Sequence, residues 1–259
     1  MPPITPTVRN LLIVNVLLYF ASGNLFPVDL FALHDPRSEY FRPHQFITHM
    51  FMHGDTMHLF SNMFSLFIFG PMLEHHWGGK RFLIFYFVTG LGASLLYMGI
   101  RYYEVSQVMD AATAFLQNPD PIDFKRLLEA ANLNTQRYEQ VLVDFYRNPE
   151  NPQLIAETKE FVQLVSERVV NGSMLGASGA VFGILMAFGM LFPNTKLFLL
   201  FFPFPIKAKY FVFLYGAFEL YAGVQRNPGD NVAHFAHIGG MIFAYILLKI
   251  WERQRNNFY

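Results

Sequence analysis

Six apolar stretches of roughly the length needed to cross a bilayer recur along the chain, and polar or turn-forming segments separate them. A hydrocarbon core of about 30 Å needs about 20 apolar residues in a helix, so each stretch predicts one membrane-spanning helix. The second and fifth stretches are the weakest, because they contain His58, Asn62 and Glu219. The six stretches cover residues 8–26, 56–73, 81–100, 173–192, 208–224 and 232–251.

The segment between the third and fourth stretches, 101–172, differs in composition, with eleven acidic and seven basic residues. Proline-containing turns divide it, and its apolar residues recur at helical spacing, most clearly in an amphipathic stretch over 152–170. We expect a water-facing helical subdomain here. The chain then divides into 1–100 (spans one to three, with an external loop at 23–55), 101–172 (the insert) and 173–259 (spans four to six).

Composition agrees with an all-α polytopic membrane protein: 53% of the residues are hydrophobic and 15% are charged. A soluble domain of this length carries about 25% charged residues. The formal net charge is zero, so no nucleic-acid partner is expected. The absence of cysteine excludes disulfides, thiolate metal sites and a cysteine nucleophile.

Basic residues near the span ends predict the orientation. With a cytoplasmic N-terminus, nine lysines and arginines lie on the inside and three lie in the short outside loops. The positive-inside rule therefore places both termini in the cytoplasm. Spans two, four and six then run inward from the outer face, and the insert lies outside.

Four polar residues fall near the outer ends of those three spans. His58 and Asn62 lie early in span two, Ser178 early in span four and His237 early in span six. Each is about 2 to 6 residues past the start of its span, so all four lie within about 10 Å of the outer end. Polar groups that share one depth inside a membrane indicate a functional site.

Ser178 stands in the run Gly176-Ala177-Ser178-Gly179 at the start of span four. The flanking glycines allow other backbones to approach closely, and the free N–H groups of a helix N-terminus suit a developing oxyanion. The alternative is that the small residues only pack helices together within the membrane.

His237 can activate such a serine, because histidine is the usual base near neutral pH. Gly240 and Ala244 form a small-residue face that would pack span six on span four and bring His237 to Ser178. The alternative is a histidine that only hydrogen-bonds a neighbouring helix.

For the remaining polar residues in or beside the spans, we expect simpler roles. His58 and Asn62 share one helix face and can both donate hydrogen bonds to an oxyanion, or else join two helices as a polar pair. For Glu219 we expect a paired or protonated structural role, and for Asp230 a cap at the start of span six.

Together the motifs H-x-x-x-N, G-x-S-G and A-H-x-x-G-x-x-x-A, in this order and at one depth, resemble the rhomboid family of intramembrane serine proteases. The resemblance covers roughly 41–100 and 172–244 and implies a six-helix bundle, with an extramembrane helical insert where the family's loop is commonly short. It also implies cleavage of the transmembrane segments of membrane-protein substrates near the outer face, by an enzyme surrounded by the lipid bilayer. A multi-pass protein of a bacterial inner membrane fits this picture.

The resemblance also assigns roles to residues. Ser178 is the nucleophile and His237 the base of a dyad, without a required acidic third member. No carboxylate is obviously placed for that job, and neither a metal nor a cofactor is expected. The oxyanion hole comprises His58, Asn62 and the amide of Ser178, and Phe182 is an aromatic ring that packs on the base. The supporting residues are Gly176, Gly179, Phe182 and Gly240.

Two other functions are compatible with parts of the pattern. One is a catalytically inactive rhomboid-like protein that binds membrane clients, which would usually lack the serine or the histidine. The other is a metal or proton transporter, because several histidines could line a pathway and imidazole binds Zn²⁺ well. These histidines are His49, His53, His58, His234 and His237.

Overall fold

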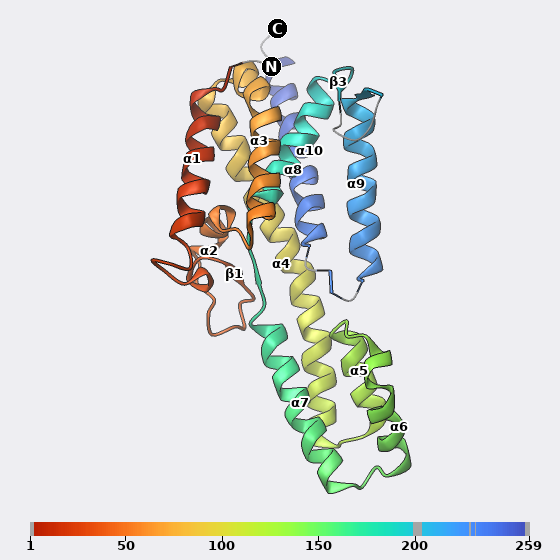
Figure 1. The fold of residues 1–259 in the computed structure, drawn as a ribbon. Helices are drawn as coiled ribbons and strands as arrows, with labels where there is room; N and C mark the ends of the chain where they lie inside the picture. Colours follow the sequence, from red (N-terminus) through yellow and green to blue (C-terminus); the bar gives the residue numbers. More distant parts are fainter. Residues whose placement is uncertain (1–2, 199–203, 228, 231, 257–259) are drawn as a thin grey trace.

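The computed structural model describes residues 3–198, 204–227, 229–230 and 232–256, and most of these are helical. Six long helices form a bundle, and a smaller helical body extends from one end of it (Figure 1). The described chain begins and ends at the opposite end of the bundle. The bundle helices are α1 (Pro6–Ala21), α3 (Thr56–Trp77), α4 (Gly79–Gln117), α8 (Ser178–Leu191), α9 (Ala208–Gln225) and α10 (His234–Asn256).

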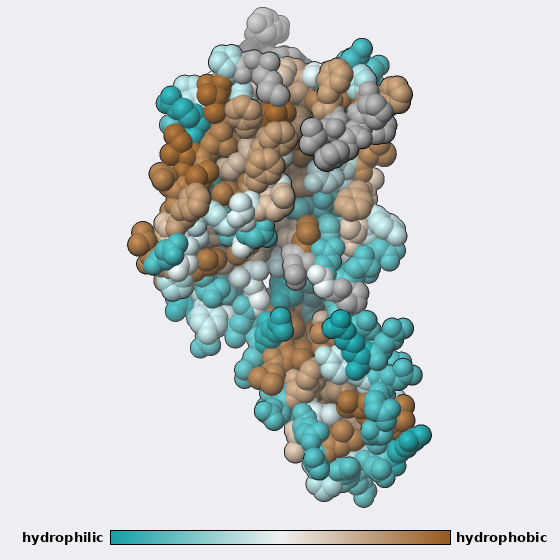
Figure 2. All heavy atoms as spheres, in the orientation of Figure 1, coloured by the Kyte–Doolittle hydropathy of each residue, from teal (hydrophilic) through white to brown (hydrophobic). Residues whose placement is uncertain are grey.

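The bundle has the length and surface of a membrane-embedded structure. Among the described residues, α3, α4 and α10 are long and apolar enough to span a bilayer, and α1 and α8 are shorter apolar helices. Large apolar side chains such as Phe64 on α3 and Phe213 on α9 point outward. Figure 2 shows apolar residues gathered over the bundle and hydrophilic ones over the smaller body. The chain is a multi-pass integral membrane protein.

Helix α4 continues without a break from the third predicted span into the insert. It has 39 residues, so the predicted boundary after residue 100 falls inside it. No proline or glycine interrupts residues 101–117, and Val105, Val108 and Phe115 continue a buried face. The change in composition at residue 101 therefore marks a change of surroundings and not the end of a helix.

The insert has its own hydrophobic core. Phe115 on α4 contacts Phe124 on α5 (Pro121–Ala130) and Phe145 on α6 (Glu139–Arg147), with ring centroids 5.6 and 5.9 Å away. A short 3-10 helix, η3 (Thr135–Tyr138), links α5 to α6. Helix α7 (Pro152–Val170) adds the buried Val162 and confirms the amphipathic helix predicted over these residues.

The loop after α1 packs against the segment that leads into α8. It contains η1 (Val28–Leu30), β1 (Leu33–His34), α2 (Gln45–Thr48) and η2 (His49–Phe51). Strand β1 pairs antiparallel with β2 (Ser173–Met174), and a second small pair joins β3 (Lys196–Leu197) to β4 (Ile206–Lys207). The Gly176 amide also donates to the His49 carbonyl at 2.9 Å, so the loop after α1 fixes the chain directly before α8.

An ion pair in the same loop anchors it to α4. Arg37 binds Asp35 at 2.7 Å and donates to the Tyr102 carbonyl at 3.0 Å. Burial raises the pKa of the Asp35 carboxyl, but the hydrogen bonds and charge of Arg37 outweigh burial and hold that pKa below its ordinary value. Asp35 is therefore ionised at neutral pH and keeps Arg37 directed at α4.

Near the other end of the bundle, Glu74 on α3 caps the first turn of α1. Its carboxylate accepts hydrogen bonds from the amides of Thr7 at 3.0 Å and Val8 at 2.9 Å, and from the hydroxyl of Thr5. The first N–H groups of a helix have no acceptor within the helix, so this carboxylate satisfies two of them and complements the helix dipole.

We expect Glu74→Gln to destabilise the protein by about 2 kcal/mol, because the neutral amide keeps one acceptor oxygen and loses the charge. The measurement is thermal unfolding of the purified protein in detergent. Glu160→Gln, which changes an exposed carboxylate on α7, is the control and should melt like the wild type. Equal melting of both variants would remove Glu74 from this capping role.

Candidate active site

Ser178 is the first residue of α8, and the chain before it is shaped by a glycine. Gly176 has φ 125°, in the region that favours glycine, and a Cβ there would clash with the His58 ring. Ser178 is half-buried, and the first amides of α8 have no acceptor within the helix. The sequence thus forms a turn that presents the serine beside unpaired N–H groups.

His58 approaches the same point from α3. Asp55 caps α3 by accepting from the His58 amide at 2.8 Å. A Cβ added at Gly176 would lie 2.6 Å from His58 Nε2 and 3.7 Å from Ser178 Oγ, so the imidazole and the hydroxyl face one small space. Asn62, one turn further on, is buried and donates to the His58 carbonyl at 3.1 Å.

Helix α10 contacts α8 almost backbone to backbone. A Cβ at Gly240 would lie only 1.9 Å from the Gly179 carbonyl oxygen. The close packing of spans four and six expected from Gly240 is therefore confirmed. It brings His237, one turn before Gly240, to the side of α8 that carries Ser178 and Phe182.

We expect Gly240→Ala to destabilise the protein by about 1–3 kcal/mol, because the new methyl group must push α10 away from α8. Gly99→Ala is the matched control, since a Cβ at that exposed helical glycine meets nothing within 4 Å. Gly99→Ala should leave the free energy of unfolding unchanged or raise it. Thermal unfolding of the two variants in detergent compares them, and equal melting temperatures would contradict the close packing.

The His237 ring is held on two sides. The Phe182 ring stacks on it with centroids 4.1 Å apart and planes 7° apart. His237 Nδ1 lies 2.7 Å from Glu219 Oε2 on α9. A carboxylate only accepts hydrogen bonds, so Nδ1 carries the proton and Nε2 is the nitrogen that can take one. In the part of the chain that the structure describes, no hydrogen bond yet joins Nε2 to Ser178.

Glu219 contacts the predicted base, a role that the sequence did not predict for it. The expected pairing of Glu219 is confirmed, but the expectation that no carboxylate stands beside the base is wrong. Two glycines bring α9 close to α10: a Cβ at Gly216 would lie 2.8 Å from Met241, and one at Gly223 3.1 Å from His234. The pattern G-x-x-E-x-x-x-G, which puts Glu219 on the glycine face of α9, is the signal that could have revealed this contact.

The same carboxylate oxygen binds a second histidine. His234 Nδ1 lies 2.6 Å from Glu219 Oε2, and His234 Nε2 lies 3.1 Å from Asp230 Oδ2. Asp230 also accepts from the Val232 amide at 2.9 Å, and since α10 begins only at His234, this bond closes a turn before the helix and is not the predicted helix cap. This backbone hydrogen bond, with help from His234, lowers the pKa of the Asp230 carboxyl.

Among the described residues, Glu219, His234 and His237 form the one group that could hold a metal ion, with ligand atoms within 4.8 Å of one another. The direct hydrogen bonds between them account for this closeness without an ion. The other three histidines of the transporter hypothesis, His49, His53 and His58, lie outside this group.

His49 and His53 lie in the segment between α1 and α3. Burial lowers the pKa of each imidazole to about 4, so both are neutral at neutral pH. The His53 ring is 5.1 Å from that of His58, and both of its nitrogens are buried without a partner among the described residues. A cavity of about 10 Å³, lined in part by His49, Gly176 and Ser178, is about the size of one water molecule.

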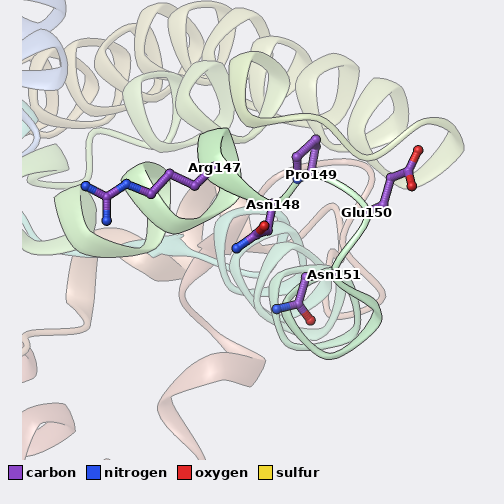
Figure 3. A pocket seen from close by; sticks show the side chains of 5 residues that line it. All are labelled: Arg147, Asn148, Pro149, Glu150 and Asn151. Atoms are coloured by element: carbon purple, nitrogen blue, oxygen red, sulfur yellow. The ribbon is translucent and has the colours of Figure 1, made fainter.

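A shallow surface hollow lies far from these residues, at the turn between α6 and α7 (Figure 3). Its lining is a run of consecutive residues, 147–151. Arg147 and Glu150 point away from each other in this view, so they do not converge on a common ligand. This hollow offers no catalytic arrangement.

The fold and the site define a class: a helical membrane protein with a serine at a helix start and a carboxylate-bound histidine beside it. Comparison with known families agrees. The rhomboid domain model matches residues 39–108 and 154–253, well over half of the chain. The protein belongs to the rhomboid family. The middle of the insert lies outside the match.

Curated relatives carry the same family name. RHOMBOID-like protein 12, mitochondrial, from Arabidopsis thaliana is 26% identical over 216 residues, which are 83% of this chain and 47% of that protein. Rhomboid protein 1, mitochondrial, from Saccharomyces cerevisiae is 38% identical over 88 residues, 32% of this chain and 25% of that protein. Rhomboid-like protein 11, chloroplastic, from Arabidopsis thaliana is 42% identical over 53 residues, 20% of this chain and 19% of that protein. The chain spans at most about half the length of these relatives, and their names refer to organelles and not to bacteria.

Proposed function

We propose that the protein is an intramembrane serine endopeptidase that cleaves transmembrane segments of membrane proteins. The observation that carries the proposal is the meeting of Ser178, at the start of α8, with His58 and with α10, whose His237 is fixed by Phe182 and Glu219. Family membership supports the reaction class. The site geometry supports the assignment of roles.

In the proposed reaction, Ser178 Oγ attacks the scissile carbonyl while its proton passes to His237 Nε2. The oxyanion receives hydrogen bonds from the Ser178 amide, His58 and Asn62. His237 then protonates the leaving amine, and water hydrolyses the acyl-enzyme by the reverse sequence. Asn62 must turn its amide away from the His58 carbonyl to take part.

The proposal includes six membrane spans, with both termini on one side and the site near the other. The bundle supports this, since α1 begins and α10 ends at one end of it, while α3, α8 and α10 all begin at the other end, next to the insert (Figure 1). We place the termini in the cytoplasm because of the charge bias of the short loops. A bacterial inner membrane fits that orientation, and the organellar relatives make a mitochondrial inner membrane the alternative.

The test is cleavage in proteoliposomes. The purified protein is incubated with a panel of single-span reporter proteins whose transmembrane segments contain small or helix-breaking residues, and products are identified by mass spectrometry. The proposal expects cut sites within or at the edge of the segment, absent with Ser178→Ala. Tight binding of the reporters with no cleavage by the folded wild type would instead favour an inactive, client-binding protein.

A further inference from the structure

Glu219 is an unusual residue for its position. Its side chain is 3% exposed within a bundle that faces lipid, and transfer of a carboxylate to such a place is costly without partners. One oxygen accepts hydrogen bonds from two imidazoles, at 2.6 Å from His234 and 2.7 Å from His237. A packing role alone would be served better by an apolar side chain.

We infer that Glu219 is a positioning residue for His237, so that the catalytic unit of this chain is a serine–histidine–glutamate triad. The inference rests on the proposed protease function and deepens it. Glu219 does not touch the substrate. It acts through the base, by holding the proton on Nδ1 and by opposing the charge that the base acquires.

The geometry fixes which nitrogen reacts. With Nδ1–H donated to Glu219 and the ring face covered by Phe182, the His237 ring has one orientation, and Nε2 is directed away from α9. When Ser178 attacks, the O–H bond breaks as the O–C bond forms, and Nε2 takes the proton. The resulting imidazolium has a proton on each nitrogen, and its positive charge lies directly beside the carboxylate. The proton leaves Nε2 for the amine as the C–N bond breaks.

The groups beside that imidazolium carry a net negative charge. Both nitrogens of His234 lie on carboxylate oxygens, of Glu219 and Asp230, and carboxylates cannot donate. His234 therefore carries two protons and one positive charge, which offsets one of the two carboxylates. The group of Glu219, His234 and Asp230 keeps a single negative charge, which stabilises protonated His237 in the transition state.

The test compares Glu219→Gln with Glu219→Asp in the full chain, using hydrolysis of a cleaved reporter. Glu219→Gln should lower kcat by about 10²–10⁴-fold with little change in KM, because the group acts on the transition state and not on binding. Glu219→Asp keeps the charge and should recover part of kcat. Glu74→Gln is the control: it is also a buried carboxylate of the bundle, it lies about 24 Å along α3 from His58, and it should leave kcat per folded molecule unchanged.

A second measurement is independent of activity. Nitrogen-15 NMR of histidine-labelled protein, assigned with His234→Gln and His237→Gln, reports which nitrogen of His237 carries the proton. We expect a strongly hydrogen-bonded Nδ1–H in wild type that weakens or moves to Nε2 in Glu219→Gln. An unchanged His237 signal, or a folded Glu219→Gln variant with kcat within about twofold of wild type, would overturn the triad. A wild type as inactive as Ser178→Ala would instead overturn the protease proposal, and the NMR result would then decide alone whether Glu219 positions His237.

Discussion

Replacing Ser178 by alanine is expected to lower the rate of reporter cleavage by about 10⁴–10⁶-fold, and His237→Ala should have an effect of the same order. The hydroxyl of Ser178 is a weak nucleophile until a base removes its proton, so loss of either partner removes the same step. The double variant should be no slower than the single variants, because the two residues act as one unit.

The control for this pair is the neighbouring histidine. His234→Gln removes an imidazole from the same carboxylate but leaves Ser178, His237 and the His237–Glu219 contact in place. It should therefore remain measurably active where His237→Ala is not. An inactive His234→Gln beside an active His237→Ala would show that the base is misassigned.

The second large effect is expected at the oxyanion donors. His58→Ala should lower kcat by about 10²–10³-fold with a smaller change in KM, because the imidazole N–H is needed once charge develops on the substrate oxygen. Asn62→Ala should lower kcat in the same range if its amide leaves the His58 carbonyl during the reaction. Steady-state cleavage of one reporter by each variant separates kcat from KM.

Ser61→Ala, which changes the hydroxyl between these two residues on α3, is the control and should behave like the wild type. Among the described residues, Ser61 Oγ donates only to the His58 carbonyl of its own helix, at 3.1 Å, and Ser61 is exposed. Near-wild-type kcat for Asn62→Ala would leave His58 and the Ser178 amide as the donors and would remove Asn62 from the oxyanion hole.

Much of the site could be predicted from the sequence, because it depends on where helices begin. Ser178, His58 and His237 each lie within the first turn of a helix or just after it, and the three helices run in one direction. Because the three residues lie at similar distances from the starts of their helices, they also lie at a similar depth in the bundle. The small residues Gly240 and Ala244 predicted which face of span six would touch span four, since only small side chains allow such an approach.

Glu219 could not be placed by the same reasoning. It lies on α9, which runs the opposite way, and this helix is apolar around most of its circumference, so hydrophobic periodicity does not define which face turns inward. The rotation of α9 is set by Gly216 and Gly223 against α10. Composition also could not predict where α4 ends. A helix ends where its backbone is interrupted, and nothing between Ile100 and Gln117 interrupts α4, so the helix continues past the predicted start of the insert.

The most direct test of the central proposal is covalent labelling of the purified, detergent-solubilised protein with a fluorophosphonate probe, followed by mass spectrometry of the labelled peptide. The proposal predicts a single adduct on Ser178 that is lost in both Ser178→Ala and His237→Ala. The contradicting result is a folded wild-type protein that stays unlabelled even by probes small enough to pass the insert. It would show that Ser178 is not an activated serine and would overturn the proposal that the protein is a protease.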